Sequence, residues 1–299
     1  MSVSLAKSND NGIAAAYMAA AVAVLIWGAT PAATKIAVTH FDPLIAAVLR
    51  TVIAGIIIFP VLIFGRLGRP GSAKDWLMVS VAGFCGFIGF TILFSYGVER
   101  TSGSHAALIN AGIPVFTGIF GVIAERRIPG RWWFVGVALA IVGETLLITY
   151  RGAGDDGVTL TGDLLCVLSS ASSGLCYVVG AHLAKRLGAV TVTFWAISLS
   201  AALMLPVLFW VGGDVDWSAV AIEGWNAIIY LAIISSVLGF VCWYWALARG
   251  GAVRMGTVQF AMPLISLSLA VGFLGEVLTL PLVLSAMIIV AGIAVARRG

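Results

Sequence analysis

The feature that most constrains this chain is a succession of long apolar segments joined by short polar connections. A transmembrane helix needs roughly 20 predominantly apolar residues, and ten segments come close to this length. They cover residues 13–38, 43–65, 75–95, 102–123, 132–149, 162–184, 189–211, 225–248, 252–274 and 280–296. Of the 299 residues, 61% are hydrophobic and 10% charged, whereas globular domains have about 25% charged residues. The sequence therefore predicts an all-α integral membrane protein with ten transmembrane helices.

The basic residues in the connections predict an orientation. With the N-terminus in the cytoplasm, thirteen Lys and Arg residues fall on the cytoplasmic side, and only Arg100 and Arg151 fall on the other. Because basic residues concentrate in cytoplasmic loops, we expect residues 1–12 to be a cytoplasmic tail and both termini to be cytoplasmic. The net charge of +4 then needs no nucleic-acid partner. The first segment is too long for a signal-peptide core and lacks a cleavage site after it, so we expect it to be retained.

The second half of the chain resembles the first. Residues 94–114 (FSYGVERTSGSHAALINAGIP) align without a gap to residues 243–263 (WYWALARGGAVRMGTVQFAMP). Pro60 corresponds to Pro206 in the same order. We therefore predict two repeats, residues 13–150 and 151–299. Each holds five helices, so the second enters the membrane inverted, an arrangement that recurs in secondary transporters with a site between the repeats. Channels with inverted repeats are the alternative.

A carboxamide precedes a proline at the same spacing in both repeats. Asn110 lies four residues before Pro114, and Gln259 lies four residues before Pro263. Proline inside a helix frees the carbonyl four residues earlier, and in a membrane such a carbonyl needs a protein partner or a hydrated cavity. We interpret the prolines as hinges and the two carboxamides as groups that bind a substrate. The alternative is that the carboxamides only bond a neighbouring helix.

Aromatic side chains deep in the segments are candidates for the apolar wall of a binding site. They are Trp27, Phe87, Tyr177 and, within a cluster near the end of its segment, Trp243. Aromatic residues near helix ends more often form the interfacial belts of membrane proteins, and that interpretation stays open for Trp243.

Ionisable residues inside apolar segments suggest functional sites. Lys35 lies near the end of the first segment, where its side chain could also extend to the membrane surface. Arg50 is expected to pair with a carbonyl or an acid, and Glu144 to be pH-sensitive or exposed at a helix bend. Glu99, His105 and Glu144 are candidates for proton coupling, and passive uniport is equally open.

Several kinds of site are not indicated. The four cysteines lack the spacing of zinc ligands and are interpreted as packing residues, so no metal and no cofactor are predicted. The three histidines are far apart, and no phosphate-binding loop or nucleophile elbow is present. A cluster of Lys and Arg suited to phosphate is also missing from the segments. These observations favour a neutral, zwitterionic substrate and argue against an enzyme.

The chain resembles the EamA family of the drug/metabolite transporter superfamily. The matching motifs are IWGATPAATKIA (26–37), AAVLRTVIAG (46–55) and, in each repeat, a proline followed by a glutamate: Pro114 with Glu125, and Pro263 with Glu276. Within that family it looks like the YddG-type bacterial amino-acid exporters. The resemblance implies a ten-helix inverted-repeat fold in the bacterial inner membrane and export of aromatic and other neutral amino acids. Glu144 departs from the apolar residue usual at that place, so no role is carried over to it.

From the sequence we therefore expect a secondary transporter that exports amino acids and related metabolites across the lipid bilayer by alternating access. Asn110 and Gln259 are expected to bond the polar head of the substrate, and the aromatic residues its apolar part. The alternatives are a drug or other metabolite exporter on the same fold and a channel-like facilitator.

Overall fold

The computed structural model describes residues 2–65, 67–126, 129–149, 158–213, 215–250, 255–296 and 298. Within these ranges all regular structure is helical and no strand occurs, which confirms the predicted class. Among the described residues, eight helical segments are long and apolar enough to cross a membrane, and two shorter apolar helices follow them. The eight are Gly12–His40, Pro43–Phe64, Ala73–Glu99, Gly103–Ala124, Arg131–Thr149, Leu160–Leu187, Ala189–Val211 and Ile222–Gly250, and the shorter ones are Met262–Leu274 and Leu280–Ala296. The boundaries follow the ten predicted segments within a few residues, except in the ninth, of which residues 252–254 lie outside the described ranges.

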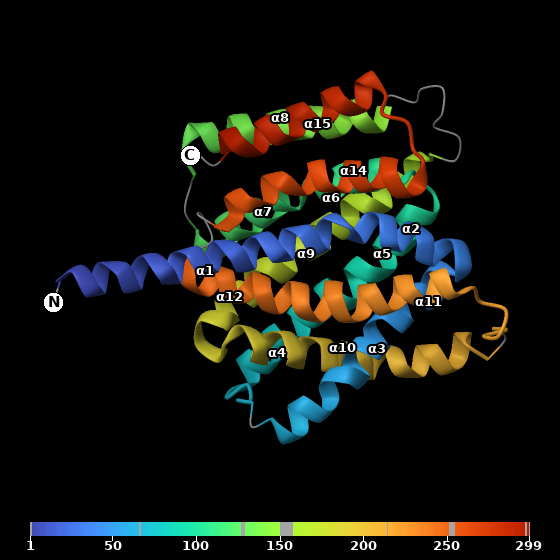
Figure 1. Cartoon of the computed structure of the whole chain (residues 1–299), viewed down its shortest axis with the longest axis horizontal. Coiled ribbons are helices and arrows are strands. Elements are labelled where there is room, and N and C mark those ends of the chain that lie inside the picture. The colour runs from blue at the N-terminus through green and yellow to red at the C-terminus, as the bar shows by residue number, and fades with distance from the viewer. Residues whose placement is uncertain are drawn as a thin grey trace.

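Many of the apolar segments consist of more than one helix. The first half contains α1 (Ser2–Gly28), α2 (Thr30–His40), α3 (Pro43–Phe64), α4 (Ala73–Gly83), the π-helix η1 (Phe84–Gly89), α5 (Phe90–Glu99), α6 (Gly103–Asn110), α7 (Ile113–Glu125) and α8 (Arg131–Thr149). Helix α1 begins at Ser2, so the helix already includes most of the predicted polar tail, and this end projects beyond the body of the molecule (Figure 1).

The second half repeats several of these irregularities. It contains α9 (Leu160–Leu187), α10 (Ala189–Val211), α11 (Ile222–Ile229), the π-helix η2 (Tyr230–Gly239), α12 (Phe240–Gly250), the 3₁₀-helix η3 (Gly256–Ala261), α14 (Met262–Leu274) and α15 (Leu280–Ala296). A π-helical stretch interrupts both the third and the eighth apolar segment. Proline lies inside both α3 and α10, at Pro60 and Pro206.

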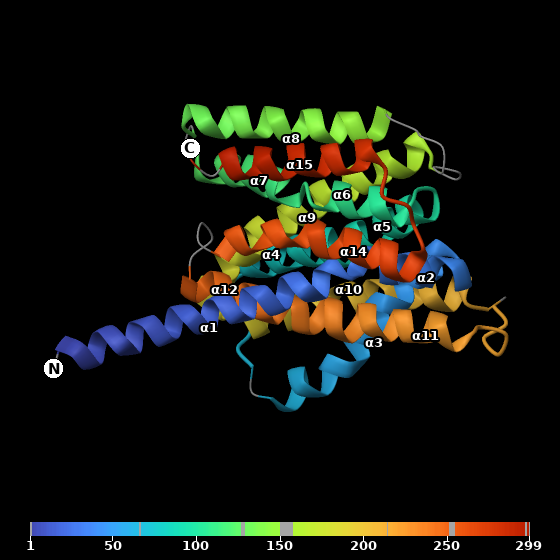
Figure 2. The same ribbon diagram turned by 45° about the horizontal axis from the view of Figure 1, so that its top comes forward.

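The helices run alongside one another, with two helix pairs at opposite edges (Figures 1 and 2). At one edge α8 packs against α15, and at the other α3 packs against α10. Between them α1 contacts α12 and α14, while α9 contacts α5, α4 and α7. Helices α1 and α9 are thus the central elements. Helix α1 packs mainly on helices of the second half of the chain, and α9 packs mainly on helices of the first half.

The two prolines proposed as hinges begin helices instead of bending them from within. Pro114 lies in the first turn of α7, after a turn at Ala111 and Gly112 that separates α7 from α6. Pro263 lies in the first turn of α14, directly after η3. The expectation of a proline in a helix interior is therefore wrong at both positions. The carbonyl of Gln259, expected to be free, accepts the backbone N–H of Met262. Proline is tolerated in the first turn because the backbone N–H groups there have no intrahelical acceptor, so the N–H that proline lacks costs no helical hydrogen bond.

Candidate functional site

A small cavity lies in the centre of the molecule. Its wall consists of Trp27, Thr30, Arg50, Phe90, Asn110, Ile113, Ser173, Tyr177, Ser235, Phe240 and Met262. The space open to the centres of water-sized molecules is about 20 Å³, enough for about one water. Both halves of the chain contribute to the wall, and the cavity must enlarge before it can hold a metabolite.

One side of the cavity is aromatic. The indole of Trp27 stacks on Tyr177, with ring centroids 5.4 Å apart and planes inclined by 16°. The ring of Phe240 stands edge-on to Trp27 at 5.1 Å. Trp243 packs behind this group, 5.7 Å from Trp27. Edge-on and offset stacked arrangements are favourable for aromatic rings, so these side chains form a fixed apolar wall. The predicted residues Trp27 and Tyr177 line the cavity directly.

The π-helix η2 supplies the polar side of the cavity. The carbonyl of Ser235 accepts the indole N–H of Trp27 at 3.1 Å, and its hydroxyl lies 2.9 Å from that of Thr30. The Ser236 hydroxyl donates to the carbonyl of Leu231, five residues earlier, at 2.9 Å. A wider π-helical turn often marks a functional site. Here it places two consecutive serines toward the first half of the chain.

Arg50 joins this polar side from α3. Its Nε donates to the Ser236 hydroxyl at 2.9 Å, and its Nη2 donates to the Ser235 hydroxyl at 3.1 Å. The guanidinium also lies over the ring of Phe90, 5.6 Å from the centroid. Only 5% of Arg50 is exposed. The predicted partner, a carbonyl or an acid, is therefore wrong: the partners are two serine hydroxyls.

The remaining predicted binding residues divide into two groups. Asn110 lines the cavity at the end of α6, and its buried Oδ1 has no hydrogen-bond partner among the described residues. Phe87 and Trp243 are buried beside the wall but are not part of it, and Phe87 packs on Phe240 at 4.7 Å. Gln259 is half-buried in η3 and does not line the cavity. The structure thus brings Asn110, but not Gln259, to the centre.

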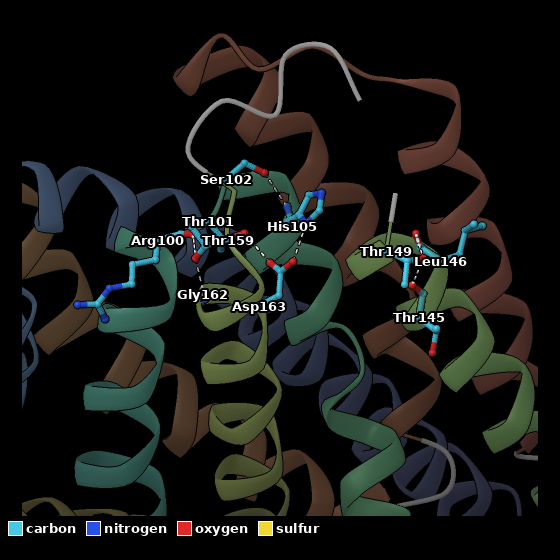
Figure 3. Close-up of polar contacts among 10 residues, drawn as sticks. All are labelled: Arg100, Thr101, Ser102, His105, Thr145, Leu146, Thr149, Thr159, Gly162 and Asp163. Atoms are coloured by element: carbon cyan, nitrogen blue, oxygen red, sulfur yellow. Dashed lines mark hydrogen bonds and ion pairs between the residues drawn. The ribbon is translucent and has the colours of Figure 1, made fainter. Parts of the chain in front are cut away.

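A second polar cluster lies at one end of the bundle, which we call the Asp163 end (Figure 3). Asp163 of α9 is fully buried, accepts a hydrogen bond from the Thr101 hydroxyl at 2.5 Å, and lies 3.3 Å from Nδ1 of His105 on α6. Lys35 donates to the carbonyls of Val98 and Thr101 at 2.8 and 2.7 Å. These contacts tie helices of the first half to α9 and hold Lys35 within the protein.

Glu276 closes the same end from the second half. Its carboxylate oxygens accept the backbone N–H groups of Gly103 and Ser104 at 2.6 and 2.8 Å, at the N-terminus of α6. The Ser102 hydroxyl accepts the next N–H group of that helix. Gly275 has φ +67°, a conformation that glycine adopts without strain, and this turns the chain so that Glu276 faces α6. The carboxylate therefore caps a helix whose N-terminal dipole attracts negative charge.

The opposite end of the bundle carries its own contacts between the halves. Arg186 of α9 forms an ion pair with Asp75 of α4. The indole of Trp195 donates to the carbonyl of Gly68 at 3.1 Å. With contacts between the halves at both ends and little space between them, the observed conformation is closed around the central cavity.

Two acidic residues predicted as charge sites lie away from the cavity wall. Glu99 is at the C-terminal end of α5 and forms an exposed ion pair with Arg100 at 3.4 Å. Glu144 of α8 is half-buried, and its buried Oε1 has no hydrogen-bond partner among the described residues. Glu144 contacts the turn at Gly112, between α6 and α7. In the described ranges no group of three or more His, Cys, Asp or Glu could hold a metal ion.

Several residues of the wall were not predicted from the sequence, including Thr30, Ser173, Ser235 and Phe240. One signal was present. Two adjacent serines, Ser235 and Ser236, interrupt an otherwise apolar run, and polar residues inside membrane helices frequently bond other helices.

Comparison with known proteins gives a family. The model of the EamA-like transporter family matches residues 14–149 and again residues 160–298. An uncharacterized transporter of Bacillus subtilis (strain 168), YdeK, is 34% identical over 93% of this chain and 95% of its own length. An uncharacterized transporter of Archaeoglobus fulgidus is 26% identical over 94% of this chain and 98% of its own. A solved crystal structure with 19% identity superposes with a TM-score of 0.67, covering 94% of this chain and 97% of that one.

Proposed function

Since the chain belongs to the EamA-like transporter family of the drug/metabolite transporter superfamily, we propose that it exports neutral amino acids, aromatic ones in particular, by alternating access. The observation that carries this proposal is the central cavity, where stacked aromatic rings face hydroxyl, carboxamide and guanidinium groups. An aromatic amino acid has the same division into an apolar ring and a polar, charged head. Sites that bind small molecules typically combine an apolar wall with a few placed polar groups.

The proposed mechanism depends on two inverted repeats of five helices. The family matches the chain twice, at residues 14–149 and 160–298. Pairs of equivalent helices, α8 with α15 and α3 with α10, pack on each other at the two edges, an arrangement that supports a two-fold axis between the halves. The π-helices η1 and η2 lie at equivalent places. Interrupted helices at the interface of inverted repeats are typical of transporter binding sites.

The cycle follows from the closed conformation. Contacts between the halves occur at the Asp163 end and at the Asp75–Arg186 end, so one set must break for substrate to enter and the other for it to leave. The turn at Ala111 and Gly112 before Pro114, and the 3₁₀-helix before Pro263, are the proposed points of bending. Gln259 lies off the cavity wall and is not needed in this cycle.

The direction and location belong to the same proposal. The distribution of Lys and Arg supports cytoplasmic termini, and with that orientation the Asp163 end faces outward; the bacterial inner membrane is part of the proposal through the resemblance to bacterial exporters. Export then corresponds to loading from the Asp75–Arg186 end and release at the Asp163 end.

The experiment is uptake of labelled phenylalanine into proteoliposomes, with competition by other amino acids, lipophilic cations and sugars. Saturable uptake, accelerated by phenylalanine preloaded inside, is expected of an amino-acid carrier. Trp27→Ala and Asn110→Ala are each expected to lower uptake at least tenfold, because each variant loses one aromatic or charge-assisted contact with the substrate and such a contact is worth about a tenfold change in binding. Trp210→Ala and Asn226→Ala, at exposed positions, are the matched controls.

Each alternative gives a different result. A drug exporter would transport lipophilic cations instead of phenylalanine, and a channel-like facilitator would show no acceleration by internal substrate. No uptake above empty liposomes, from folded protein, would refute the amino-acid proposal.

A further inference from the structure

The central cavity contains a buried positive charge that no acidic side chain of the described residues neutralises. No carboxylate of the described residues lies within 4.0 Å of the Arg50 guanidinium, and its hydrogen bonds go to two neutral hydroxyls. Burial of an ion without a counter-ion is costly, because hydroxyl groups satisfy hydrogen bonds but leave the charge uncompensated. Inside a membrane helix, such a residue usually marks a substrate or ion pathway.

The guanidinium also has donors to spare. Arginine carries five N–H groups in a planar fork, and the contacts of Arg50 within the described ranges use Nε and one N–H of Nη2. The Nη1 group has no partner there, and Arg50 forms part of the cavity wall. A planar fork with free N–H groups matches a carboxylate, which it binds through two parallel hydrogen bonds.

We infer that Arg50 is the anchor for a carboxylate of the transported substrate. This inference rests on the proposed function and names the chemical class that the cavity selects: an organic carboxylate with an aromatic or other apolar side chain. The hydroxyls of Thr30 and Ser235 lie on the same wall and hydrogen-bond to each other, so one of the two keeps a hydrogen that it can donate to the same carboxylate.

Asn110 supplies the complement for an amino group. Its Oδ1 is buried, accepts no hydrogen bond from the described residues, and belongs to the same wall. An ammonium group is a donor without acceptor capacity, so it satisfies the Oδ1 that the protein leaves unpaired. Arg50 and Asn110 together distinguish the two ends of a zwitterionic head group, while Trp27 and Tyr177 receive the side chain.

A purely structural role for Arg50, joining α3 to η2 through the two serines, is the competing explanation. The two roles differ in what they predict for ligands without a carboxylate. Loss of a structural contact weakens binding of every ligand alike. Loss of a carboxylate anchor weakens binding of carboxylates alone.

The test uses the purified full-length chain in detergent and equilibrium binding of four probes: phenylalanine, phenylalaninamide, 3-phenylpropanoate and phenethylamine. The wild-type protein is expected to bind phenylalanine more tightly than phenylalaninamide. Arg50→Gln is expected to remove this preference, a change on the order of 10- to 100-fold for a hydrogen-bonded charged group. Arg50→Lys keeps the charge without the fork and should retain part of the preference. Arg100→Gln, at an exposed arginine, is the control and should leave it unchanged.

The outcomes separate this inference from the proposed function. If the wild type binds phenylalanine and its amide equally, or if both Arg50 variants weaken all four probes by the same factor, the carboxylate anchor is refuted while amino-acid transport can stand. If 3-phenylpropanoate binds in an Arg50-dependent manner and phenylalanine does not bind, the anchor stands and the amino-acid proposal fails. No binding of any carboxylate probe to folded wild-type protein refutes both.

Discussion

Glu276 gives the clearest quantitative test of how the closed conformation is held. Its two oxygens accept N–H groups of Gly103 and Ser104 at the start of α6. Glu276→Gln keeps one acceptor oxygen but loses the charge and the second acceptor. Removal of a capping acceptor costs about 1 kcal/mol, to which the interaction with the helix dipole contributes. Since RT is about 0.59 kcal/mol, the population open at the Asp163 end should rise about fivefold.

The native residue Cys166 can report this opening. It is fully buried on α9, one turn beyond Asp163, against Gly97. In a variant that keeps Cys166 as its single cysteine, a water-soluble maleimide reacts only when the end opens. Where opening and closing are fast compared with labelling, the rate follows the open population. Glu276→Gln should therefore label about five times faster.

The control is Glu223→Gln, which removes an exposed acid from the first turn of α11. It should leave the labelling rate of Cys166 within twofold of the parent. An unchanged rate in Glu276→Gln, or an equal change in the control, would show that the carboxylate does not hold this end closed. Thermal unfolding midpoints of both variants separate local opening from general destabilisation.

Three further predictions concern packing and the buried network. Asp163→Ala leaves two buried partners unsatisfied and should cost roughly 3 kcal/mol, a loss visible in thermal unfolding; an unchanged midpoint would contradict the assigned contacts. Gly136→Ala places a methyl group against the backbone of α15 and should lower the midpoint by an overpacking cost of about 1–3 kcal/mol, whereas Gly121→Ala, in open space on α7, should preserve or raise it. Gly239→Ala would bring a methyl group to 2.7 Å from Nε1 of Trp27 and displace the indole. The free energy of binding aromatic substrates should therefore fall more than the free energy of unfolding. If the variant binds these substrates as tightly as the parent protein, the position of Trp27 has no role in binding.

The sequence was most informative where one physical property decides the structure. Apolar segments of membrane length became helices at nearly the predicted boundaries, because a helix satisfies its own backbone hydrogen bonds in lipid. The partners of Arg50 were not predictable in this way. Ser235 and Ser236 lie more than 180 residues away in the chain, and only the packing of α3 on η2 brings them together.

Gln259 shows a second feature that the sequence did not predict. It occupies the place of Asn110 in the aligned sequences, yet it lies in a 3₁₀-helix whereas Asn110 ends an α-helix. A 3₁₀-helix has three residues per turn instead of 3.6, so equivalent residues point in different directions after a few positions. Equivalent positions in the sequence therefore did not predict the direction of the side chain.

Under the proposed alternating access, the buried charge of Arg50 is expected to make transport sensitive to the membrane potential. A charge fixed in the centre does not cross the bilayer. The membrane potential, however, falls across the part of the protein that is not filled with water, and this part changes from one side of the charge to the other when the entrance closes on one side and opens on the other. A unit charge that passes through the whole drop exchanges about 2.3 kcal/mol per 100 mV, and Arg50 exchanges the fraction that moves past it. A zwitterionic amino acid adds no net charge to the site, so the empty and the loaded protein should reorient with the same voltage dependence. A carboxylate without an amino group would cancel the charge of Arg50 and remove the voltage dependence from the loaded step.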